Sequence, residues 1–358
     1  MNERPITIIV TVYNIEPYLE RFFKCLEAQT FSGYEALIID DGSTDNSLSI
    51  CEKHAAKDDR IHVVHSEHVG ISQARNIALS MLQTPLATSL DGDDYFEKDY
   101  LKHLYDAWKK YNADFIISNV ITHNEALEET SRFTPRAEEL FEGEQIRDVL
   151  PALLSENRLN YLYGKLYRTE LLKDIRVEPD VMQGSDTMIN CQYAIKSAGI
   201  VVIEDYDYNY ITYRSRSVTS YKGEAYYSRL LRLNLYVRDL MRENGFYTRE
   251  METAVDIRIL FVGKIALTRI CGAKLPKSEK YKQASQVAQN ADYVASYDRQ
   301  KDRISSLDFR VVPPGTERDY VDETTAVFRD AEKDAKKEKL RSKIPKPLLK
   351  AYSKLRNH

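Results

Sequence analysis

Strand-like and helix-like segments alternate through the first 120 residues, and this alternation constrains the fold more than any other feature of the chain. Residues 6–12 (ITIIVTV) form a continuous β-branched run, which is typical of a strand buried on both faces. The segment after it carries apolar residues three and four positions apart, as on one face of a helix. Further strands are predicted at residues 37–39, 61–65, 86–90 and 115–118. The repetition predicts an α/β fold, with a mostly parallel sheet and helices on both of its faces.

The character of the sequence changes after residue 225, where strand patterns give way to helical ones. Residues 226–244 and 253–270 carry apolar side chains at helical spacing. We therefore expect a Rossmann-like domain over residues 1–225 and a helical appendage over residues 226–328. Residues 329–358 read as a basic, amphipathic tail.

Charge is distributed unevenly along the chain. The formal net charge is −4, yet residues 333–358 contain ten basic and two acidic side chains, a local charge of +8. The rest of the chain therefore carries −12. Such a tail is either solvated and partly disordered or attracted to an anionic membrane surface. Nucleic acid is not an expected partner, because binding it usually requires a basic folded surface and this body is acidic.

Composition and spacing exclude several classes of protein. Hydrophobic residues make up 43% of the chain, and no run approaches the roughly 20 apolar residues of a membrane span, so a transmembrane protein is not expected. The first residues lack the pattern of an export signal. Four widely separated cysteines indicate neither a disulfide framework nor a zinc knuckle. His62, His65 and His68 lie three apart, and on a strand such side chains point to opposite faces, so no histidine metal site is predicted. We expect a cytoplasmic protein.

Two acidic turns follow predicted strands. Asp91-Gly92-Asp93-Asp94 comes after the strand at 86–90, and Asp40-Asp41-Gly42-Ser43-Thr44-Asp45 comes after the strand at 37–39. In a parallel α/β sheet, ligands bind beyond the carboxyl ends of the strands. Carboxylates placed there suit a hard cation such as Mg²⁺ or Mn²⁺, held together with the phosphate oxygens of a substrate. Taken alone, each motif can also be a solvated turn or a helix cap.

Two further motifs open predicted helices. Val10–Asn14 (VTVYN) ends the first strand, and Asn14 is expected to cap the helix that follows. Gly70–Asn76 (GISQARN) opens another helix, whose first backbone N–H groups and dipole favour an anion. Arg75 within it adds a full positive charge that can meet a diphosphate. The alternative interpretation of Arg75 is a surface residue of an ordinary helix.

In order and spacing, these four motifs resemble the family 2 glycosyltransferases of the GT-A fold. The family pattern is a Val-x-Val-Tyr-Asn strand end, Asp-Asp-Gly-Ser-x-Asp, Gly-x-x-x-Ala-Arg-Asn and an Asp-x-Asp-Asp metal turn, and all four blocks are present. The resemblance implies a GT-A fold and a UDP-sugar donor, with Asp91 facing the sugar or ribose. It places Mn²⁺ or Mg²⁺ on Asp93 with Asp91, uracil on Asp41, the nucleoside beside Thr11 and Tyr13, and the diphosphate or the base near Arg75.

Weaker matches to the same family continue to about residue 220. Tyr163–Arg168 resembles the segment before the acceptor region, and Gly184-Ser185-Asp186 resembles a Gly-Glu-Asp block whose Asp is the catalytic base. Ser185 stands where glutamate is common, so the resemblance leaves Asp186 as the base. A helix cap is the alternative role of Asp186. Arg214 and Arg216 lie in a segment that resembles a late block whose basic side chains close over the diphosphate.

The resemblance implies an inverting, metal-dependent transferase that moves a hexose or N-acetylhexosamine from a UDP-sugar to a hydroxyl of a glycan, lipid-linked or cell-envelope polymer acceptor. It also favours association of the basic tail with the inner face of the cell membrane. Two alternatives stay open. A sugar-phosphate nucleotidyltransferase would carry a Gly-rich phosphate loop after the first strand, and residues 11–16 contain no glycine. A non-catalytic glycan- or membrane-binding protein would keep the fold with a decayed site.

Overall fold

The computed structural model describes residues 4–177, 184–213, 224–307 and 309–327. The chain forms two compact units, one within residues 1–220 and 232–255 and the other within residues 221–231 and 256–358. Arg214, Arg216 and the basic tail lie outside the described residues. The domain boundaries expected after residues 225 and 328 stay predictions.

Strands and helices alternate first, and helices alone follow. The strands are β1 (Ile6–Val12), β2 (Tyr34–Asp40), β3 (Ile61–His65), β4 (Leu86–Asp91), β5 (Tyr95–Phe96), β6 (Phe115–Ile117), β7 (Val120–Asn124), β8 (Glu129–Arg132), β9 (Glu139–Glu142), β10 (Lys165–Arg168), β11 (Gly199–Val202) and β12 (Tyr208–Thr212). The helices are α1 (Glu16–Glu27), α2 (Ser47–Ala55), α3 (Ile71–Met81), α4 (Tyr100–Tyr111), α5 (Glu144–Ser155), α6 (Thr169–Leu172), α7 (Ser185–Ala194), α8 (Glu224–Glu243), α9 (Arg249–Gly272), α10 (Lys277–Ala288) and α11 (Ala291–Gln300).

The larger sheet has the strand order β3-β2-β1-β4-β10-β6-β11-β9. Strand β1 pairs in parallel with β2 and with β4, so Val12 lies beside Asp40 and Thr11 beside Asp91. Strand β2 continues the parallel pairing to β3. The carboxyl ends of these strands therefore meet at one edge of the sheet, which is where both acidic turns begin.

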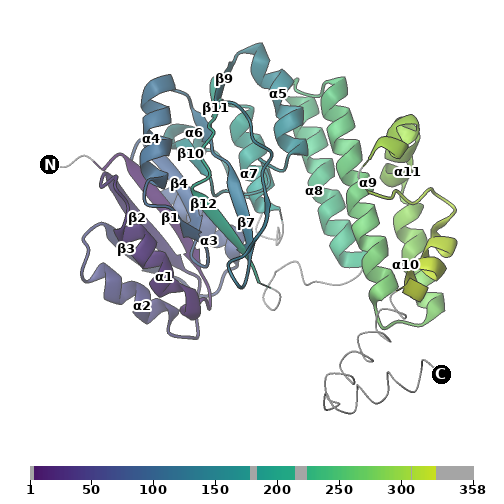
Figure 1. The fold of residues 1–358 in the computed structure, drawn as a ribbon, viewed down its shortest axis with the longest axis horizontal. Coiled ribbons are helices and arrows are strands. Elements are labelled where there is room, and N and C mark those ends of the chain that lie inside the picture. Colours follow the sequence, from purple (N-terminus) through teal and green to yellow (C-terminus); the bar gives the residue numbers. More distant parts are fainter. Residues whose placement is uncertain (1–3, 178–183, 214–223, 308, 328–358) are drawn as a thin grey trace, which may run out of the picture. The chain divides into compact units, whose positions relative to one another are not determined.

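Helices cover both faces of this sheet, which confirms the predicted α/β architecture (Figure 1). Because side chains alternate along a strand, neighbouring residues of β1 face different helices. Ile8 belongs to a core with Phe22 of α1 and Leu104 of α4. Ile9 lines a small cavity on the opposite face, together with Leu79 of α3 and Ile189 of α7. The sheet is thus packed between α1, α2 and α4 on one face and α3 and α7 on the other.

The second half of the sheet is less parallel than the sequence predicts. Strand β10 is antiparallel to both of its neighbours, β4 and β6, and β9 is antiparallel to β11. Strand β11 is parallel to β6. The chain leaves this sheet through β7 and β8 of the smaller sheet, returns to its edge as β9 and then reaches β10 after α5, rather than by a helical crossover from β4. It therefore enters the gap between β4 and β6 from the opposite direction.

A smaller sheet, in the order β5-β12-β7-β8, lies next to the turn that follows β4. Strand β12 is antiparallel to β5 and parallel to β7. The ring of Tyr208 stacks on that of Tyr163, with centroids 4.4 Å apart, and Tyr210 stacks on the same ring at 5.4 Å. Because β5 begins directly after Asp94, this aromatic cluster is built against the second acidic turn.

The carboxyl-terminal part is helical, as the sequence predicts, and comprises α8 to α11. Within the second unit, Asp256 of α9 is buried and accepts hydrogen bonds from Ser296 at 2.8 Å and from Arg299 at 2.6 Å. None of the four cysteines forms a disulfide. A search of the described part of the chain finds no helix with the length and apolar character needed to cross a membrane.

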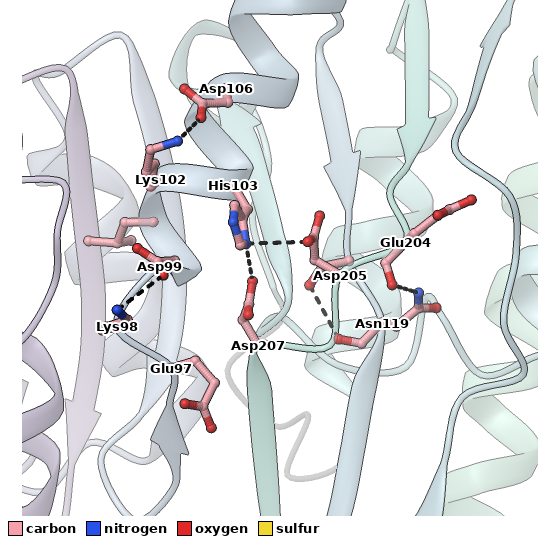
Figure 2. A network of polar contacts seen from close by, with 12 residues as sticks. Glu97, Lys98, Asp99, Lys102, His103, Asp106, Asn119, Glu204, Asp205 and Asp207 are labelled. Atoms are coloured by element: carbon pink, nitrogen blue, oxygen red, sulfur yellow. Dashed lines mark hydrogen bonds and ion pairs between the residues drawn. The ribbon is translucent and has the colours of Figure 1, made fainter.

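A polar network ties α4 to the loop before β12 (Figure 2). Nδ1 of His103 lies 2.7 Å from the Asp207 carboxylate and 3.3 Å from that of Asp205. Burial alone would lower the pKa of His103, but the hydrogen bond to Asp207 and the charges of both aspartates outweigh it, so the pKa is raised above 6.5. The protonated form of His103 therefore stabilises the folded state.

We expect the stability contributed by His103 to depend on pH. Since its folded-state pKa exceeds the unfolded value, the contribution is complete below about pH 6.5 and is lost as the pH rises through the folded-state pKa. His103→Gln should lower the free energy of unfolding by less than about 1 kcal/mol at pH 6, and by less still at pH 9, in urea denaturation. His62→Gln, on an exposed residue of β3, is the matched control. A larger loss at pH 9 than at pH 6 would contradict this assignment.

Candidate active site

The sequence motifs lie at the edge of the larger sheet where β1, β2 and β4 end. Asp91 is the last residue of β4 and pairs in register with the half-buried Thr11 of β1. Paired residues of parallel strands point to the same face, so Asp91 shares the face of Ile9. That face is the one covered by α3 and α7.

The loop after β1 is locked to the acidic turn after β2. Asn14 has a φ of +52°, and its side-chain oxygen accepts a hydrogen bond from the backbone N–H of Thr44 at 2.7 Å. In return, Ser43 Oγ accepts from the N–H of Asn14 at 3.0 Å, and the Asp45 carboxylate accepts from the N–H of Glu16 at 3.2 Å. The prediction that Asn14 caps α1 is wrong, because its left-handed conformation directs the side chain toward the acidic turn.

Asp41 is buried in the acidic turn and is held by the loop before α3. Its two carboxylate oxygens accept hydrogen bonds from the backbone N–H groups of Val69, at 2.7 Å, and Gly70, at 3.0 Å. Nδ1 of His68 lies 3.0 Å from the same carboxylate. The ring of Tyr13 stacks on His68, with centroids 4.2 Å apart, and is 45% exposed. An exposed aromatic ring and a fixed carboxylate are therefore connected through His68.

The neighbouring Asp40 supports the turn. It is fully buried, accepts a hydrogen bond from the N–H of Ser43 at 3.2 Å and lies 2.8 Å from Nδ1 of His65. Gly42 has a φ of +71°, and a Cβ atom there would lie 2.7 Å from the backbone nitrogen of His68. A larger residue at position 42 would thus displace the loop that carries the Asp41 contacts.

The carboxylates of the second acidic turn have different surroundings. Asp94 is fully buried, and its two oxygens accept hydrogen bonds from the Tyr208 hydroxyl and the Ile211 N–H, both at 2.8 Å. These bonds join the turn to β12. Asp93 is half-buried, and its backbone carbonyl accepts hydrogen bonds from Arg21 and, at 2.9 Å, from the Tyr213 hydroxyl. The carboxylate of Asp94 therefore has a structural role, because both of its oxygens bond to β12.

Asp91 lies within a cluster of charges from several segments. Removal from water and the negative charges of Asp93 and Asp186 raise the pKa of Asp91 to about 7, against the opposing positive charge of Arg75. Neighbouring carboxylates repel one another unless a counter-charge is present. Mg²⁺ and Mn²⁺ prefer carboxylate oxygens as ligands. Asp91 and Asp93 therefore fit the cation that the sequence predicts for this turn.

A different group of metal-type ligands lies elsewhere. His103, Asp205 and Asp207 bring ligand atoms close together. His103 is on α4, and the two aspartates lie just before β12, whereas Ile211, which contacts Asp94, is near the other end of that strand. Its three side chains already pair with one another, so we assign it a structural role.

Arg75 and Asp186 form an ion pair between α3 and the start of α7. Nη1 of Arg75 lies 2.5 Å from Oδ1 of Asp186 and 2.5 Å from Oγ of Ser185. The Ser185 hydroxyl lies 3.2 Å from the same Asp186 oxygen. The Arg75 side chain is 7% exposed, so it is not the surface residue of the alternative interpretation. Where glutamate is common in the family pattern, this chain places a neutral hydroxyl against the guanidinium.

The predicted site residues within the described part of the chain form two sets, with Thr11 between them. Arg75, Asp91, Asp93 and Asp186 form one electrostatic cluster. Tyr13 and Asp41 form a second set at the end of β2, where both contact His68. Thr11 is on β1, the strand between β2 and β4, and is paired with Asp91. Arg214 and Arg216 are outside the described residues, although Tyr213, just before them, contacts the second acidic turn.

Three contributors to the site were not predicted. Tyr208 holds the second acidic turn, and the alternation of tyrosines at 206, 208 and 210 is a sequence signal for one face of a strand. His68 contacts Asp41 but resembles any loop histidine in the sequence. Arg21 contacts the Asp93 carbonyl from α1, and nothing in its sequence context distinguishes it from a solvated helix residue.

Comparison with known proteins gives a consistent result. Residues 7–176 match the family model described as glycosyl transferase family 2. The chain is 30% identical over 218 residues to glycosyltransferase GlyA of Streptococcus pneumoniae, a match that covers 57% of this chain and 30% of that protein. It is 33% identical over 122 residues to glycosyltransferase GlyG of the same organism, covering 34% of this chain and 40% of that protein. The chain thus spans less than half the length of these two relatives.

The fold is also similar to that of a solved structure. The crystal structure of S. aureus TarS, residues 1–349, in complex with UDP-GlcNAc aligns with a TM-score of 0.65 and 19% sequence identity. The alignment covers 93% of this chain and 92% of that one. At this level of identity the likeness concerns the fold, which is the GT-A type that the sequence predicts.

Asp94 and Asp93 of the second acidic turn should contribute differently to the free energy of unfolding. Asp94→Ala leaves two buried donors, the Tyr208 hydroxyl and the Ile211 N–H, without acceptors, and should lower the free energy of unfolding by about 2–5 kcal/mol. Asp93→Ala, at a half-buried position, should change it by less than about 1 kcal/mol. Chemical denaturation of both variants gives the comparison. Equal losses, or a larger loss for Asp93→Ala, would show that the two carboxylates are wrongly assigned.

Proposed function

We propose that the chain, whose residues 7–176 match the family model described as glycosyl transferase family 2, transfers a sugar from a UDP-sugar to an acceptor hydroxyl, with inversion at the anomeric carbon and the help of a divalent cation. One observation carries the proposal: Asp186 pairs with the buried Arg75, and the charges of both residues, together with that of Asp93, act on Asp91. A candidate proton acceptor and a candidate cation site thus lie in one cluster, which is what sugar transfer from a nucleoside diphosphate requires.

The donor nucleoside is assigned to the edge formed by β1 and β2. Asp41 accepts the imide N–H of uracil, and the backbone hydrogen bonds from Val69 and Gly70 hold its carboxylate in place. Tyr13 offers the exposed ring on which a base can stack, with His68 packed behind it. Thr11 lines the nucleoside pocket between this edge and Asp91.

The cation is assigned to Asp93 with Asp91. When bound, Mn²⁺ or Mg²⁺ neutralises the charge that develops on the departing UDP. The raised pKa of Asp91 supports the assignment, because a carboxylate that is costly to ionise by itself is favoured once a positive charge is near. Arg75 supplies a permanent positive charge in the same cluster. The named contacts occupy its Nη1, and the remaining N–H groups of the guanidinium suit diphosphate oxygens.

Asp186 is assigned as the base. The acceptor oxygen attacks the anomeric carbon, the bond to UDP breaks, and the hydroxyl proton passes to the Asp186 carboxylate. Arg75 and Ser185 both engage Oδ1, so Oδ2 is the oxygen left for the acceptor. A single displacement of this kind converts an α-linked donor into a β-glycoside.

The acceptor is assigned to the glycans, lipid-linked saccharides or polymers of a cell envelope. Support comes from S. aureus TarS, which is 27% identical over 215 residues and is named a poly(ribitol-phosphate) β-N-acetylglucosaminyltransferase. The charge of +8 in residues 333–358 fits attraction to the anionic surface on which such acceptors are carried.

We expect UDP to bind the full chain in a metal-dependent way. Calorimetric titration should show binding with Mn²⁺ present and at least about tenfold weaker binding without it. Asp93→Asn should abolish this dependence, because it removes a charged ligand of the cation. Asp99→Asn, which changes a carboxylate at the start of α4, is the matched control and should behave as wild type. UDP affinity that is the same with and without Mn²⁺ in the wild type would exclude the proposed cation site.

Asp186→Asn should separate binding from turnover. Loss of a general base lowers the rate by about 10²–10⁴-fold, so release of UDP from a UDP-sugar should fall by that factor while UDP binding is kept. Ser185→Ala, at the neighbouring position, should have a much smaller effect. Pyrophosphate release from a nucleoside triphosphate would favour the nucleotidyltransferase. Binding of UDP without turnover of any UDP-sugar would favour the non-catalytic alternative.

A further inference from the structure

A cavity of about 330 Å³ opens beside the smaller sheet, and its lining includes none of the residues assigned to the donor. Its lining includes Thr122 of β7, Ser131 of β8, and Asn157 and Tyr161, which follow α5. Its volume lies at the lower end of the range for small-molecule pockets. The cavity is therefore large enough for a small ligand and none of the roles assigned above uses it.

The lining of this cavity combines aromatic rings with uncharged polar groups. Tyr161 and Phe133 are half-buried and contribute rings, whereas Thr122, Ser131 and Asn157 contribute hydroxyl and amide groups. A pyranose presents the same combination, with an apolar C–H face that packs on a ring and hydroxyls around its edge. The lining thus offers rings for the apolar face of a sugar and polar groups for its hydroxyls.

The charges at the cavity are paired within the protein. Arg132 forms an ion pair with Glu129, with Nε 2.7 Å from the carboxylate. Glu156 accepts from Arg136 at 3.1 Å and from Arg158 at 2.7 Å. With these charges balanced, the pocket favours a neutral ligand over a phosphate or a carboxylate.

A buried arginine holds the wall of the cavity in place. The side chain of Arg158 is fully buried, and it donates to Asn119 Oδ1 at 2.8 Å, to the Thr134 carbonyl at 2.6 Å and to Glu156. Its guanidinium also lies over the ring of Phe133, 5.2 Å from the centroid. A cavity whose wall is tied to a buried cation keeps its shape without a ligand, which is a property of binding sites.

Stacked tyrosines connect the cavity to the second acidic turn. Tyr161 stacks on Tyr163 with centroids 4.9 Å apart, and Tyr163 stacks on Tyr208 at 4.4 Å. The Tyr208 hydroxyl donates to the Asp94 carboxylate. Tyr163, which lines the cavity, thus contacts the residue that holds the second acidic turn.

We propose that this cavity binds a neutral sugar residue of the acceptor glycan, away from the hydroxyl that reacts. The inference rests on the proposed function and deepens it, because it assigns an acceptor subsite to the cavity lined by Thr122, Ser131, Asn157 and Tyr161. Binding there holds the growing end of a glycan beside the donor, so acceptors with more than one sugar are used better than single sugars.

Saturation-transfer NMR on the full chain tests the subsite directly. The probes are methyl glycosides and disaccharides of glucose, galactose and N-acetylglucosamine, with glycerol 3-phosphate as a charged comparison. We expect signals from at least one neutral disaccharide and none from glycerol 3-phosphate. Thr122→Val removes a hydroxyl at constant shape, and Asn157→Gly removes an amide while keeping the left-handed backbone, where φ is +61°. The double variant should weaken saccharide binding by about tenfold.

A control variant and a measurement of UDP binding distinguish failure of this subsite from failure of the proposed function. Thr130→Val, on β8 but not in the cavity lining, is the matched control and should bind saccharide as wild type does. UDP binding should be the same in all variants. If UDP binds but no neutral saccharide gives a signal, or if the signal is the same in the double variant, the subsite is wrong while the donor site stands. If UDP itself does not bind, the proposed function fails.

Discussion

The parallel register of β1 between β2 and β4 is the constraint on which the rest of the site depends. Both faces of β1 are buried, so its pairing cannot slip by one residue without turning polar side chains into the α1 and α4 core. With this register, Thr11 lies beside Asp91, and Asp91 shares a face with α3 and α7. A buried apolar strand thus determines where the charges of the site are found.

The carboxylates that lie there have two different kinds of surroundings. Asp94 is bonded to Tyr208 and Ile211, which makes one carboxylate of the turn a structural link to the smaller sheet. Asp91 is in the opposite situation, because its neighbours Asp93 and Asp186 are also acidic and Arg75 is the positive charge that opposes them. A cation bound together with the donor would place positive charge beside these carboxylates. The repulsion of Asp91 by Asp93 and Asp186, which is unfavourable in the free protein, therefore favours binding of a cation.

Much of this arrangement could be predicted from the sequence. Alternating periodicity predicted strands β1 to β4 and β6, the helices between them and the edge at which both acidic turns lie, because these depend on local pattern. The antiparallel entry of β10 could not be predicted, since it is decided by the path of the chain through β7, β8 and β9. The conformation of Asn14 reversed an expected cap, because contacts with Thr44 outweigh local propensity. The ion pair of Arg75 with Asp186 joins residues 111 positions apart, and pattern alone contains no information about such contacts.

The central claim is that an acceptor oxygen displaces UDP directly, with the proton passing to Asp186. The most direct measurement is proton NMR of the sugar released when the full chain hydrolyses an α-linked UDP-sugar in the presence of Mn²⁺, observed before the product mutarotates. Direct displacement predicts that the β-anomer appears first. Initial formation of the α-anomer would contradict the account, because retention requires a different mechanism from the single displacement assigned to this site.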